Sequence, residues 1–255
     1  HLSLRRQRQM CIRDRFIMFK IVFSDFDGTL TYKEGLGPIF FDVLSHLEKK
    51  QVPLVIVTGR SLSWGHFLLT HFPFLTDVIV EGGGAIVSRS GKFITEECLI
   101  SKKEVKRLAD FCVSFEKKFP NVPLSVDSFG RKTDRAIELH DLQDGTLFHH
   151  IEDYLREEKI NFSTSNVHLN FWCGEVSKYK AVQHYLAAKK TDAKDCVFFG
   201  DSLNDQTMFK SFKNSVGVAN ISAVIDRLEY KPTTILTGED NVGPWGVLNY
   251  LKKTL

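Results

Sequence analysis

An apolar run, Phe19 to Phe23, leads into the sequence Asp-Phe-Asp-Gly-Thr at residues 25–29, and this junction most constrains how the chain can fold. Residues two apart in an extended strand point to the same side, so Asp25 and Asp27 face one way. The Gly-Thr pair then breaks the strand, which places both carboxylates at its carboxyl end. Open α/β sheets bind their ligands at that end of their strands. The junction therefore predicts a buried strand of a parallel sheet with two acids at its ligand-binding edge.

Two carboxylates with this spacing suit a hard cation and a phosphate group. Magnesium takes oxygen ligands in a tight octahedron, commonly one or two carboxylates together with water and substrate phosphate. Asp25 can supply one ligand and attack phosphorus, because an aspartyl-phosphate splits one difficult displacement into two easier ones. Asp27 is then free to transfer a proton to the leaving oxygen. The alternative is an Asp-Gly turn with solvated acids, which the apolar strand before the pair makes the weaker interpretation.

Strands and helices alternate through both ends of the chain. Residues 38–50 carry a helical apolar stripe and end on two lysines, which predicts an amphipathic helix between two apolar strands. Repeated strand–helix–strand units form right-handed crossovers between parallel strands. The pattern therefore predicts an α/β fold with a doubly wound parallel-sheet core. Its expected strands are 19–23, 53–57, 77–80, 195–199, 214–218 and 233–236, and its expected helices are 38–50, 61–72, 178–189 and 242–251.

The triplet Gly82-Gly83-Gly84 interrupts this alternation. It lacks the Gly-Lys-Ser/Thr that a phosphate-binding loop needs before a helix, so it is interpreted as a flexible joint. Beyond it strands bunch with helices, as in an α+β domain with a small sheet of its own. We therefore expect a catalytic core at 18–81 and 174–255 and an inserted α+β domain at 82–173. The expected elements of the insert are a hairpin at 85–94, helices at 102–119 and 145–159, and strands at 124–127, 135–140 and 167–172.

Positive charge is concentrated at the N-terminus. The chain has a net charge of +3, of which residues 1–17 carry +4, so the remainder carries −1. A nearly neutral body gives no basis for nucleic-acid binding. Residues 1–17 lack the apolar stretch of a secretory signal and resemble translated adaptor sequence, which predicts a non-native or disordered basic tail with Met18 as the native start. An arginine-rich transit peptide is the alternative interpretation.

Composition indicates an ordinary globular protein, with 43% apolar and 25% charged residues. No run approaches the ~18 consecutive apolar residues that a membrane span needs. The five cysteines have no Cys-x-x-Cys spacing, so neither a disulfide framework nor a zinc site is expected. Cys98, Cys112, Cys173 and Cys196 lie in or beside apolar segments and are expected to be buried. These features predict a cytoplasmic monomer or homodimer with no membrane and no nucleic-acid partner.

Three further segments complete a set of four motifs at strand ends or helix starts. They are Thr58 in Val-Thr-Gly-Arg, Lys178 in Val-Ser-Lys, and Gly-Asp-Ser-Leu-Asn-Asp at residues 200–205. Together with Asp-x-Asp-Gly-Thr, they resemble the haloacid dehalogenase-like hydrolases over residues 18–255. The resemblance is to the type IIB cap subclass, which includes Cof-type, sucrose-phosphatase-like, mannosyl-3-phosphoglycerate phosphatase-like and phosphomannomutase-like proteins. It implies a Rossmann-like doubly wound core with an inserted α+β cap domain.

Three of the aspartates divide the metal and covalent chemistry that these motifs imply. An aspartyl nucleophile repels the phosphate that it attacks, so a cation has to neutralise both. Magnesium would be held by Asp25, by the backbone carbonyl of Asp27 and by Asp201. Asp25 attacks in line, Asp27 protonates the leaving alcohol, and Asp27 then activates the water that hydrolyses the aspartyl-phosphate. The resemblance implies that relatives cleaving carbon–halogen or carbon–phosphorus bonds lack this second acid, which argues for an ester phosphate.

The other motif residues are expected to bind the phosphate or to orient the residues that do: Gly28, Thr58, Gly59, Lys178, Asn204 and Asp205. Lys178 would place an ammonium near the phosphate oxygens, although Lys180 is a competing candidate. Thr58 would donate its hydroxyl to the phosphate beside the backbone amides of the two glycines, or would simply cap the next helix. Asn204 and Asp205 would orient the lysine or a metal-bound water, whereas the structural alternative for the acids after Gly200 is helix capping.

The insert is expected to carry specificity, because the core motifs read only phosphate and metal. Its candidate residues are Arg131, Lys132, Arg135, His168 and Asn170. The alternative for these residues is the polar face of a small exposed sheet. The sequence thus predicts a magnesium-dependent phosphatase for a small phosphorylated metabolite, foremost a sugar phosphate. A phosphomutase, which would need a basic cluster in the insert for a second phosphate, is the alternative, and a non-catalytic sensor of a phosphorylated ligand is a third.

Overall fold

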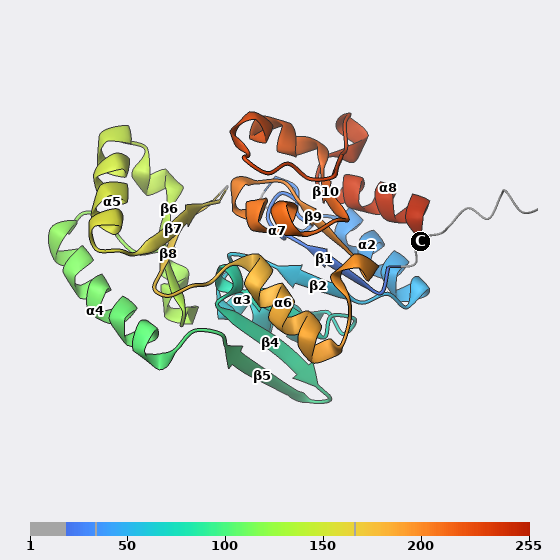
Figure 1. Ribbon diagram of the computed structural model, residues 1–255, viewed down its shortest axis with the longest axis horizontal. Helices are drawn as coiled ribbons and strands as arrows, with labels where there is room; N and C mark the ends of the chain where they lie inside the picture. Colours follow the sequence, from blue (N-terminus) through green and yellow to red (C-terminus); the bar gives the residue numbers. More distant parts are fainter. Residues whose placement is uncertain (1–18, 34, 166) are drawn as a thin grey trace, which may run out of the picture.

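We describe the fold from a computed structural model that covers residues 19–33, 35–165 and 167–255, so the basic tail at 1–17 lies outside the described residues. A sheet of eight strands has the order β11-β10-β9-β1-β2-β3-β4-β5 (Figure 1). Neighbouring strands from β11 to β3 run parallel. These six are β1 (Ile21–Ser24), β2 (Leu54–Val57), β3 (Asp77–Val80), β9 (Cys196–Gly200), β10 (Ser215–Gly217) and β11 (Thr234–Ile235). The expected α/β core with a parallel sheet is confirmed.

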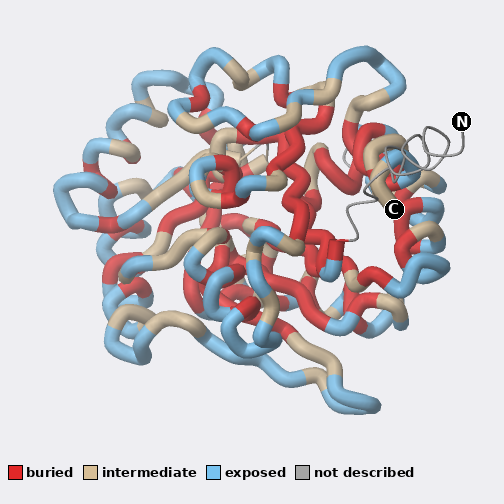
Figure 2. Tube along the Cα trace, turned by 45° about the vertical axis from the view of Figure 1, so that its right-hand side comes forward, coloured by how far each residue is buried: buried red, intermediate tan, exposed pale blue. Residues whose placement is uncertain are grey.

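Helices cover both faces of this sheet, which explains why its central strands read as unbroken apolar runs. One face packs against α2 (Pro38–Lys50), α3 (Leu62–His71) and α8 (Pro244–Thr254). The other face packs against α6 (Lys178–Lys189) and α7 (Gln206–Ser211). Figure 2 shows the buried trace concentrated in the strands between these layers. Consecutive residues of β1 go to opposite faces, so Val22 joins the first cluster and Phe23 the second.

The hairpin expected inside the insert belongs to the larger sheet instead. β4 (Ala85–Ser90) pairs antiparallel with β3, and β5 (Phe93–Cys98) pairs antiparallel with β4. The glycine triplet before it is a tight turn rather than a flexible joint. Gly83 has φ +104°, and a Cβ there would lie 2.4 Å from the carbonyl oxygen of Ser177. The turn sends the apolar start of β4 back along β3, where Ile86 and Val87 extend the core.

A second, antiparallel sheet has the order β6-β8-β7 and lies beside the core with two helices (Figure 1). Its strands are β6 (Asp134–Glu138), β7 (Asn161–Thr164) and β8 (His168–Trp172), and its helices are α4 (Lys102–Lys118) and α5 (Gly145–Glu157). These elements share a separate apolar cluster that includes Phe115 and Phe171. We call residues 102–172 the cap and the other described residues the core. The expected α+β insert is present, but it begins after the hairpin.

Two details of the cap differ from the sequence expectation. The strand expected at 124–127 is wrong, because residues Val126–Gly130 form a 3-10 turn. Ser125 sets up this turn: its carbonyl accepts from the Ser128 amide at 2.8 Å, and its hydroxyl reaches Asp127 at 3.1 Å. Strand β7 was not predicted from the sequence, since its four residues are polar apart from Phe162 and no burial pattern marks them.

Among the described residues, no helix has both the length and the apolar character to cross a membrane. Cys112, Cys173 and Cys196 are free and buried, as expected for small apolar side chains. Cys98 is exposed, although the sequence pattern predicted a buried side chain. It is the last residue of β5, the edge strand, most of whose residues face the solvent.

Asp77 links β3 to its neighbours, and its replacement tests how this side of the core is held. Its carboxylate accepts from Ser88 at 2.6 Å, Thr76 at 2.9 Å and Tyr185 at 3.0 Å, and Lys189 lies 3.2 Å away. Burial opposes ionisation, yet the hydroxyl donors and the lysine lower the pKa of Asp77 below its ordinary value. The stability that this carboxylate contributes is therefore present above its ordinary pKa and is lost as the pH falls through the lowered value.

We expect Asp77→Asn to lower the free energy of unfolding by about 1–3 kcal/mol at pH 7, since several buried donors lose their ionised acceptor. The difference between the variant and the wild type should shrink as the pH falls below the ordinary pKa of an aspartate, where first the unfolded chain and then the folded protein takes up the proton. Urea unfolding of the variant and the wild type at pH 7 and at pH 3 measures this difference in unfolding free energy. A deficit that stays constant between pH 7 and pH 3 would contradict this account.

Candidate active site

Asp25 lies at the carboxyl end of β1, between the ends of β2 and β9. Its amide donates to the Phe199 carbonyl at 2.8 Å, which continues the ladder between the two central strands. Its carboxylate is buried, with 3% of the residue exposed. Burial raises the pKa of Asp25 well above its ordinary value; Lys178 opposes this, while Asp205 and Asp201 reinforce it. A buried acid beside two others needs positive charge to remain ionised.

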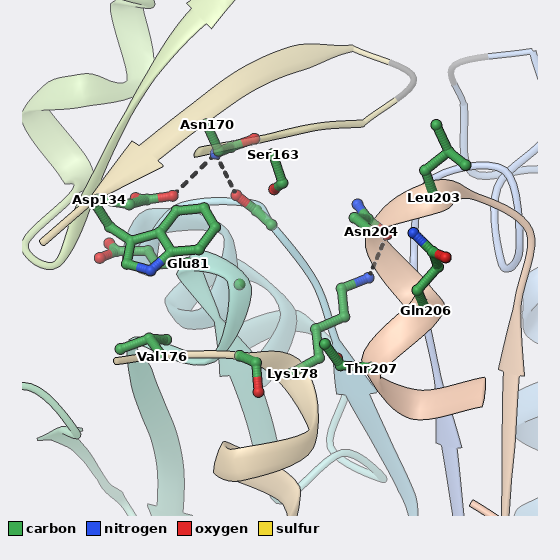
Figure 3. Close-up of a pocket in the computed structure, with 14 residues that line it drawn as sticks. Glu81, Asp134, Ser163, Asn170, Val176, Lys178, Leu203, Asn204, Gln206 and Thr207 are labelled. Carbon is green, nitrogen blue, oxygen red and sulfur yellow. Dashed lines mark hydrogen bonds between the residues drawn. The ribbon is translucent and has the colours of Figure 1, made fainter. Parts of the chain in front are cut away.

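Lys178 supplies part of that charge. It is the first residue of α6, and the Ser177 hydroxyl caps this helix by accepting from the Lys180 amide. Its buried Nζ donates to Asp25 at 2.7 Å, to Asp205 at 2.7 Å and to Asn204 at 3.0 Å; the last contact is drawn in Figure 3. Although burial disfavours the ammonium, Asp205 and Asp25 raise the pKa of Lys178 above its ordinary value. Lys180, the competing candidate, lies on the surface and pairs with Glu175.

The segment after β9 performs both of the roles considered for it. Ser202 and Asp205 form a capping box, so the capping interpretation is correct for this turn. The same Asp205 carboxylate also accepts from the Asp201 amide at 3.0 Å while it holds Lys178. Asp201 accepts from the Thr29 hydroxyl at 3.1 Å, across the gap between β9 and the β1 loop. Helix capping therefore fixes the geometry of the acidic group rather than competing with it.

Three carboxylates at this sheet edge fit a divalent cation. Asp25, Asp201 and Asp205 are all buried, and each offers an oxygen within 4.8 Å of those of the other two. Lys178 pairs with two of these acids, Asp25 and Asp205, and a divalent cation would add positive charge to the group. Oxygen donors of this kind are those that magnesium prefers. Asp27 was expected to contribute only its backbone carbonyl, and its carboxylate is outside this group.

The Asp27 carboxylate pairs with Arg60, a residue that was not predicted from the sequence to belong to the site. Arg60 Nε and Nη2 donate to its two carboxylate oxygens at 2.8 and 2.6 Å, in a bidentate pair. The guanidinium also lies over the Trp64 ring, 4.9 Å from its centroid. Arg60 directly follows Thr58-Gly59, so it belongs to the loop after β2. A bidentate pair of this type fixes the orientation of the carboxylate.

Asn220 is a second residue that the sequence analysis missed. Its side-chain amide donates to Asp201 at 2.7 Å and to the Gly28 carbonyl at 3.0 Å, and it thereby joins two of the motif loops. It lies in the turn after β10, outside every motif, and no local pattern in the sequence marks it. Only the sheet order, which places β10 next to β9, brings it to the site.

The loops expected to hold phosphate are close-packed. Thr58 directly follows β2 and is buried, and its hydroxyl accepts from the Arg60 amide at 3.1 Å. Gly28 has φ +80°, a conformation that glycine adopts without strain, and its amide donates to the Thr31 hydroxyl at 3.0 Å. The Gly28 amide, expected to face the phosphate, is thus already engaged within its own turn. Thr58 and Gly59 remain at the edge where Asp25 and Lys178 meet.

Of the five specificity candidates in the cap, the structure brings only Asn170 into a cavity beside these residues. Arg131 is buried and pairs with Asp127 and Asp134, because a buried cation needs compensating charge. His168 is also buried and lies 3.0 Å from Glu138. The remaining two point elsewhere: Lys132 pairs with Glu96 on the surface, and Arg135 lines a different hollow of the cap, with Phe119 and Phe129.

This cavity encloses about 210 Å³ between the core and the cap (Figure 3). Lys178 and Asn204 lie at its core side, and Asn170, Ser163 and Asp134 lie at its cap side. Val176 and Trp172 supply apolar surface. Its remaining lining residues are Gly59, Glu81, Gly82, Ser177, Leu203, Gln206 and Thr207. A small chamber whose charged lining residues are Lys178, Glu81 and Asp134 therefore opens beside the acidic group.

The sequence matches a known family, that of the haloacid dehalogenase-like hydrolases, at residues 22–122 and 116–228. The chain belongs to this family. A putative phosphatase from Haemophilus influenzae is 25% identical over an alignment of 225 residues, which covers 74% of this chain and 81% of the relative. A phosphoglycolate phosphatase from Methanosarcina acetivorans is 25% identical over 206 residues, 79% of this chain and 84% of the relative. The resemblance drawn from the four motifs is confirmed, as is the enzyme class, a phosphatase of this family.

Solved structures share the fold of this haloacid dehalogenase-like chain. A putative HAD/COF-like hydrolase from Plasmodium vivax has a TM-score of 0.71 at 18% identity, covering 93% of this chain and 95% of that one. The sucrose-phosphatase of Synechocystis, solved with sucrose and phosphate, has a TM-score of 0.67 at 15% identity, covering 92% and 97%. Both align over nearly their whole length, so the inserted cap is part of the shared fold and the type IIB assignment fits.

Proposed function

We propose that this protein is a magnesium-dependent phosphatase that hydrolyses a small sugar phosphate through an aspartyl-phosphate intermediate on Asp25. The observation that carries the proposal is the contact of Lys178 Nζ with Asp25 Oδ1 at 2.7 Å, beside two further buried acids. This arrangement aims an ammonium at the position where a phosphate would meet the nucleophile. Motif residues from the ends of β1, β2 and β9 and from the start of α6 converge there.

The residues of the site account for both halves of the reaction. An Asp25 carboxylate oxygen attacks phosphorus, the ester P–O bond breaks, and the leaving oxygen takes a proton from Asp27. Asp27 next accepts a proton from water, which attacks phosphorus and releases inorganic phosphate and the free Asp25 carboxylate. Arg60 pairs with both oxygens of Asp27, which suits the ionised form that remains after the proton is given up, and Lys178 would contact the phosphate oxygens from its place beside Asp25.

Magnesium fits the acids present and would be held by Asp25, the backbone carbonyl of Asp27 and Asp201. Bound there, it supplies positive charge that lets two anions, carboxylate and phosphate, approach each other. Asp205 lies close enough to be a ligand, but its two oxygens already accept from Lys178 and from the Asp201 amide. Its role is to orient the lysine.

The cavity supports a neutral, hydroxyl-bearing leaving group. Ser163, Gln206 and Thr207 offer uncharged donors and acceptors, which suit sugar hydroxyls. Among the described residues that line it, Lys178 is the one cation, and its Nζ is already shared between acids. A leaving group with a second negative charge would thus enter without a partner for that charge.

The same observation weighs against the phosphomutase alternative. A mutase must hold a second phosphate in the cap, and the three cations considered for that purpose do not line the cavity. Arg131 and Lys132 are already paired with carboxylates, and Arg135 faces another hollow. A sensor without catalysis is not favoured either, because every motif position keeps its reactive residue.

Phosphate release separates these functions. With magnesium, we expect the purified protein to release inorganic phosphate from hexose 6-phosphates with a kcat/KM at least about tenfold above that for phosphoglycolate, because an unpaired carboxylate in the cavity costs more than 1.4 kcal/mol. EDTA should abolish the activity and added magnesium should restore it. A preference for phosphoglycolate would contradict the neutral leaving group, and isomerised sugar phosphate without phosphate release would establish the mutase.

A further inference from the structure

Two cap side chains donate to one backbone carbonyl of the core. Arg131 Nη1 donates to the Gly59 carbonyl oxygen at 3.0 Å, and Asn170 Nδ2 donates to the same oxygen at 3.3 Å. Gly59 lies in the loop after β2 that is proposed to bind phosphate. Asn170 Nδ2 also donates to Asp134 at 2.9 Å, and Figure 3 shows this side chain between the cap and the core. The loop is therefore held from the cap as well as from the core.

The guanidinium of Arg131 is fixed in this position by its own partners. Nε and Nη2 donate to Asp127 at 2.7 and 2.9 Å, and Nη1 donates to Asp134 at 2.8 Å. The side chain is completely buried. Two carboxylates thus neutralise this cation, which makes it unsuited to binding a phosphate itself but leaves an N–H directed at Gly59.

The other end of the same peptide unit determines what Thr58 can do. The Arg60 amide, which shares its peptide plane with the Gly59 carbonyl, donates to Thr58 Oγ1 at 3.1 Å. A hydroxyl that accepts from this amide keeps its single proton for another acceptor. Holding the Gly59 carbonyl therefore fixes the peptide plane, and the plane fixes the Thr58 hydroxyl as a donor toward the phosphate position.

The cap turn that carries Arg131 sits tightly against the core. A Cβ on Gly130 would lie 1.8 Å from Ser63 Oγ and 2.9 Å from Ser63 Cβ, so only glycine allows this approach. Ser63 is in the first turn of α3, the helix that follows the Thr58–Arg60 loop. The contact sets the distance from which Arg131 reaches Gly59.

We propose that Arg131 and Asn170 are positioning residues that orient the Thr58–Arg60 loop by holding the Gly59 carbonyl from the cap. The affinity of the core for phosphate then depends on the cap being docked, even for an anion that does not touch the cap. This inference rests on the proposed function in one respect, namely that the loop binds phosphate. It replaces direct substrate contact as the role of Arg131.

The test measures binding of inorganic phosphate in the presence of magnesium, by calorimetry, in the full-length protein. We expect Arg131→Met and Asn170→Ala each to weaken phosphate binding roughly 10-fold, the effect of losing one hydrogen bond that holds a charged site. Arg131→Lys, which can still donate one bond to the carbonyl, should give an intermediate value. Substrate KM should rise with the phosphate dissociation constant in these variants, while kcat changes less.

Two matched controls remove the same chemistry elsewhere. Arg107 in α4 donates to the backbone carbonyls of Glu158 and Lys159 at 3.0 Å, and Asn161 donates to the Gly174 carbonyl at 2.7 Å. We expect Arg107→Met and Asn161→Ala to bind phosphate as the wild type does. Thermal melts show whether each variant is folded. If Arg131→Met does not fold, the phosphate affinity of Asn170→Ala tests the inference.

The outcomes separate this inference from the proposed function. Wild-type phosphate affinity in both Asn170→Ala and a folded Arg131 variant would overturn the inference, even if the KM for a sugar phosphate rose, because these residues would then read the leaving group. A wild-type protein that bound no phosphate would overturn it as well. If the wild type hydrolysed no ester but the variants still lost phosphate affinity, the proposed function would fail and the inference would stand.

Discussion

Asp25→Asn is expected to lower kcat by at least about 10⁴-fold with any phosphate ester, because an amide cannot form the acyl-phosphate and the remaining groups cannot replace a nucleophile. The substitution keeps the size of the side chain. It also removes one of three clustered acids, while Lys178 retains Asp205 and Asn204. The variant should therefore fold, and in EDTA its Tm should equal or exceed that of the wild type. Single-turnover kinetics and thermal melts measure both effects.

The matched control for this experiment is Asp226→Asn, which removes an exposed acid outside the site. Its kcat and Tm should stay at the wild-type values. Retention of more than about 1% of the activity in Asp25→Asn would identify a different nucleophile, since loss of a nucleophile alone removes far more. A variant that failed to fold would instead show that Asp25 is needed for the structure, and the covalent intermediate would then be sought by trapping on the wild type.

The placement of the motif residues could be predicted from the sequence because each motif combines a local pattern with an element end. Asp25, Thr58 and Asp201 each follow an apolar run, and the ends of neighbouring parallel strands meet at one edge. Lys178 was expected early in a helix, and in the structure it is the first residue of α6, directly after the capping Ser177. Parallel pairing therefore brings Asp25, Thr58 and Asp201 together, whereas Lys178 reaches Asp25 from the start of α6.

Arg60 and Asn220 could not be found this way, because their roles depend on contacts between loops. Nothing local distinguishes Asn220 from other loop asparagines until β10 is placed beside β9. Arg131 illustrates a different limit, since a sequence shows a cation but not what neutralises it. Its partners Asp127 and Asp134 are four and three residues away. This spacing was the one feature of the sequence that indicated an ion pair within the cap.

The placement of the hairpin depends on a property of the glycine triplet that composition does not show. Three glycines predict flexibility, but Gly83 is buried against Ser177 with no room for a Cβ. Its close approach turns β4 back along β3 and at the same time supports the start of α6. The residue that ends the parallel sheet thus also helps to place the helix that begins with Lys178.

Lys178→Met should affect both catalysis and stability, because the same ammonium faces the phosphate and balances buried acids. We expect kcat/KM to fall by about 10²–10³-fold or more, as for other preorganised charged contacts. Without metal, the loss of one partner from a buried ion pair should cost about 3–5 kcal/mol of unfolding free energy. Magnesium should recover part of this loss, since a cation that binds only the folded state stabilises it. Urea unfolding with EDTA and with magnesium measures both terms.

Lys180→Met is the matched control, two residues along the same helix, where the lysine is exposed and pairs with exposed Glu175. Surface pairs of this type contribute little, so activity and stability should stay near the wild-type values. A reversal, with Lys180→Met inactive and Lys178→Met active, would show that the buried ammonium serves only to hold the three acids together. If Lys178→Met were inactive but unchanged in stability, the acids would be protonated in the folded protein, and magnesium rather than lysine would be what ionises Asp25 for attack.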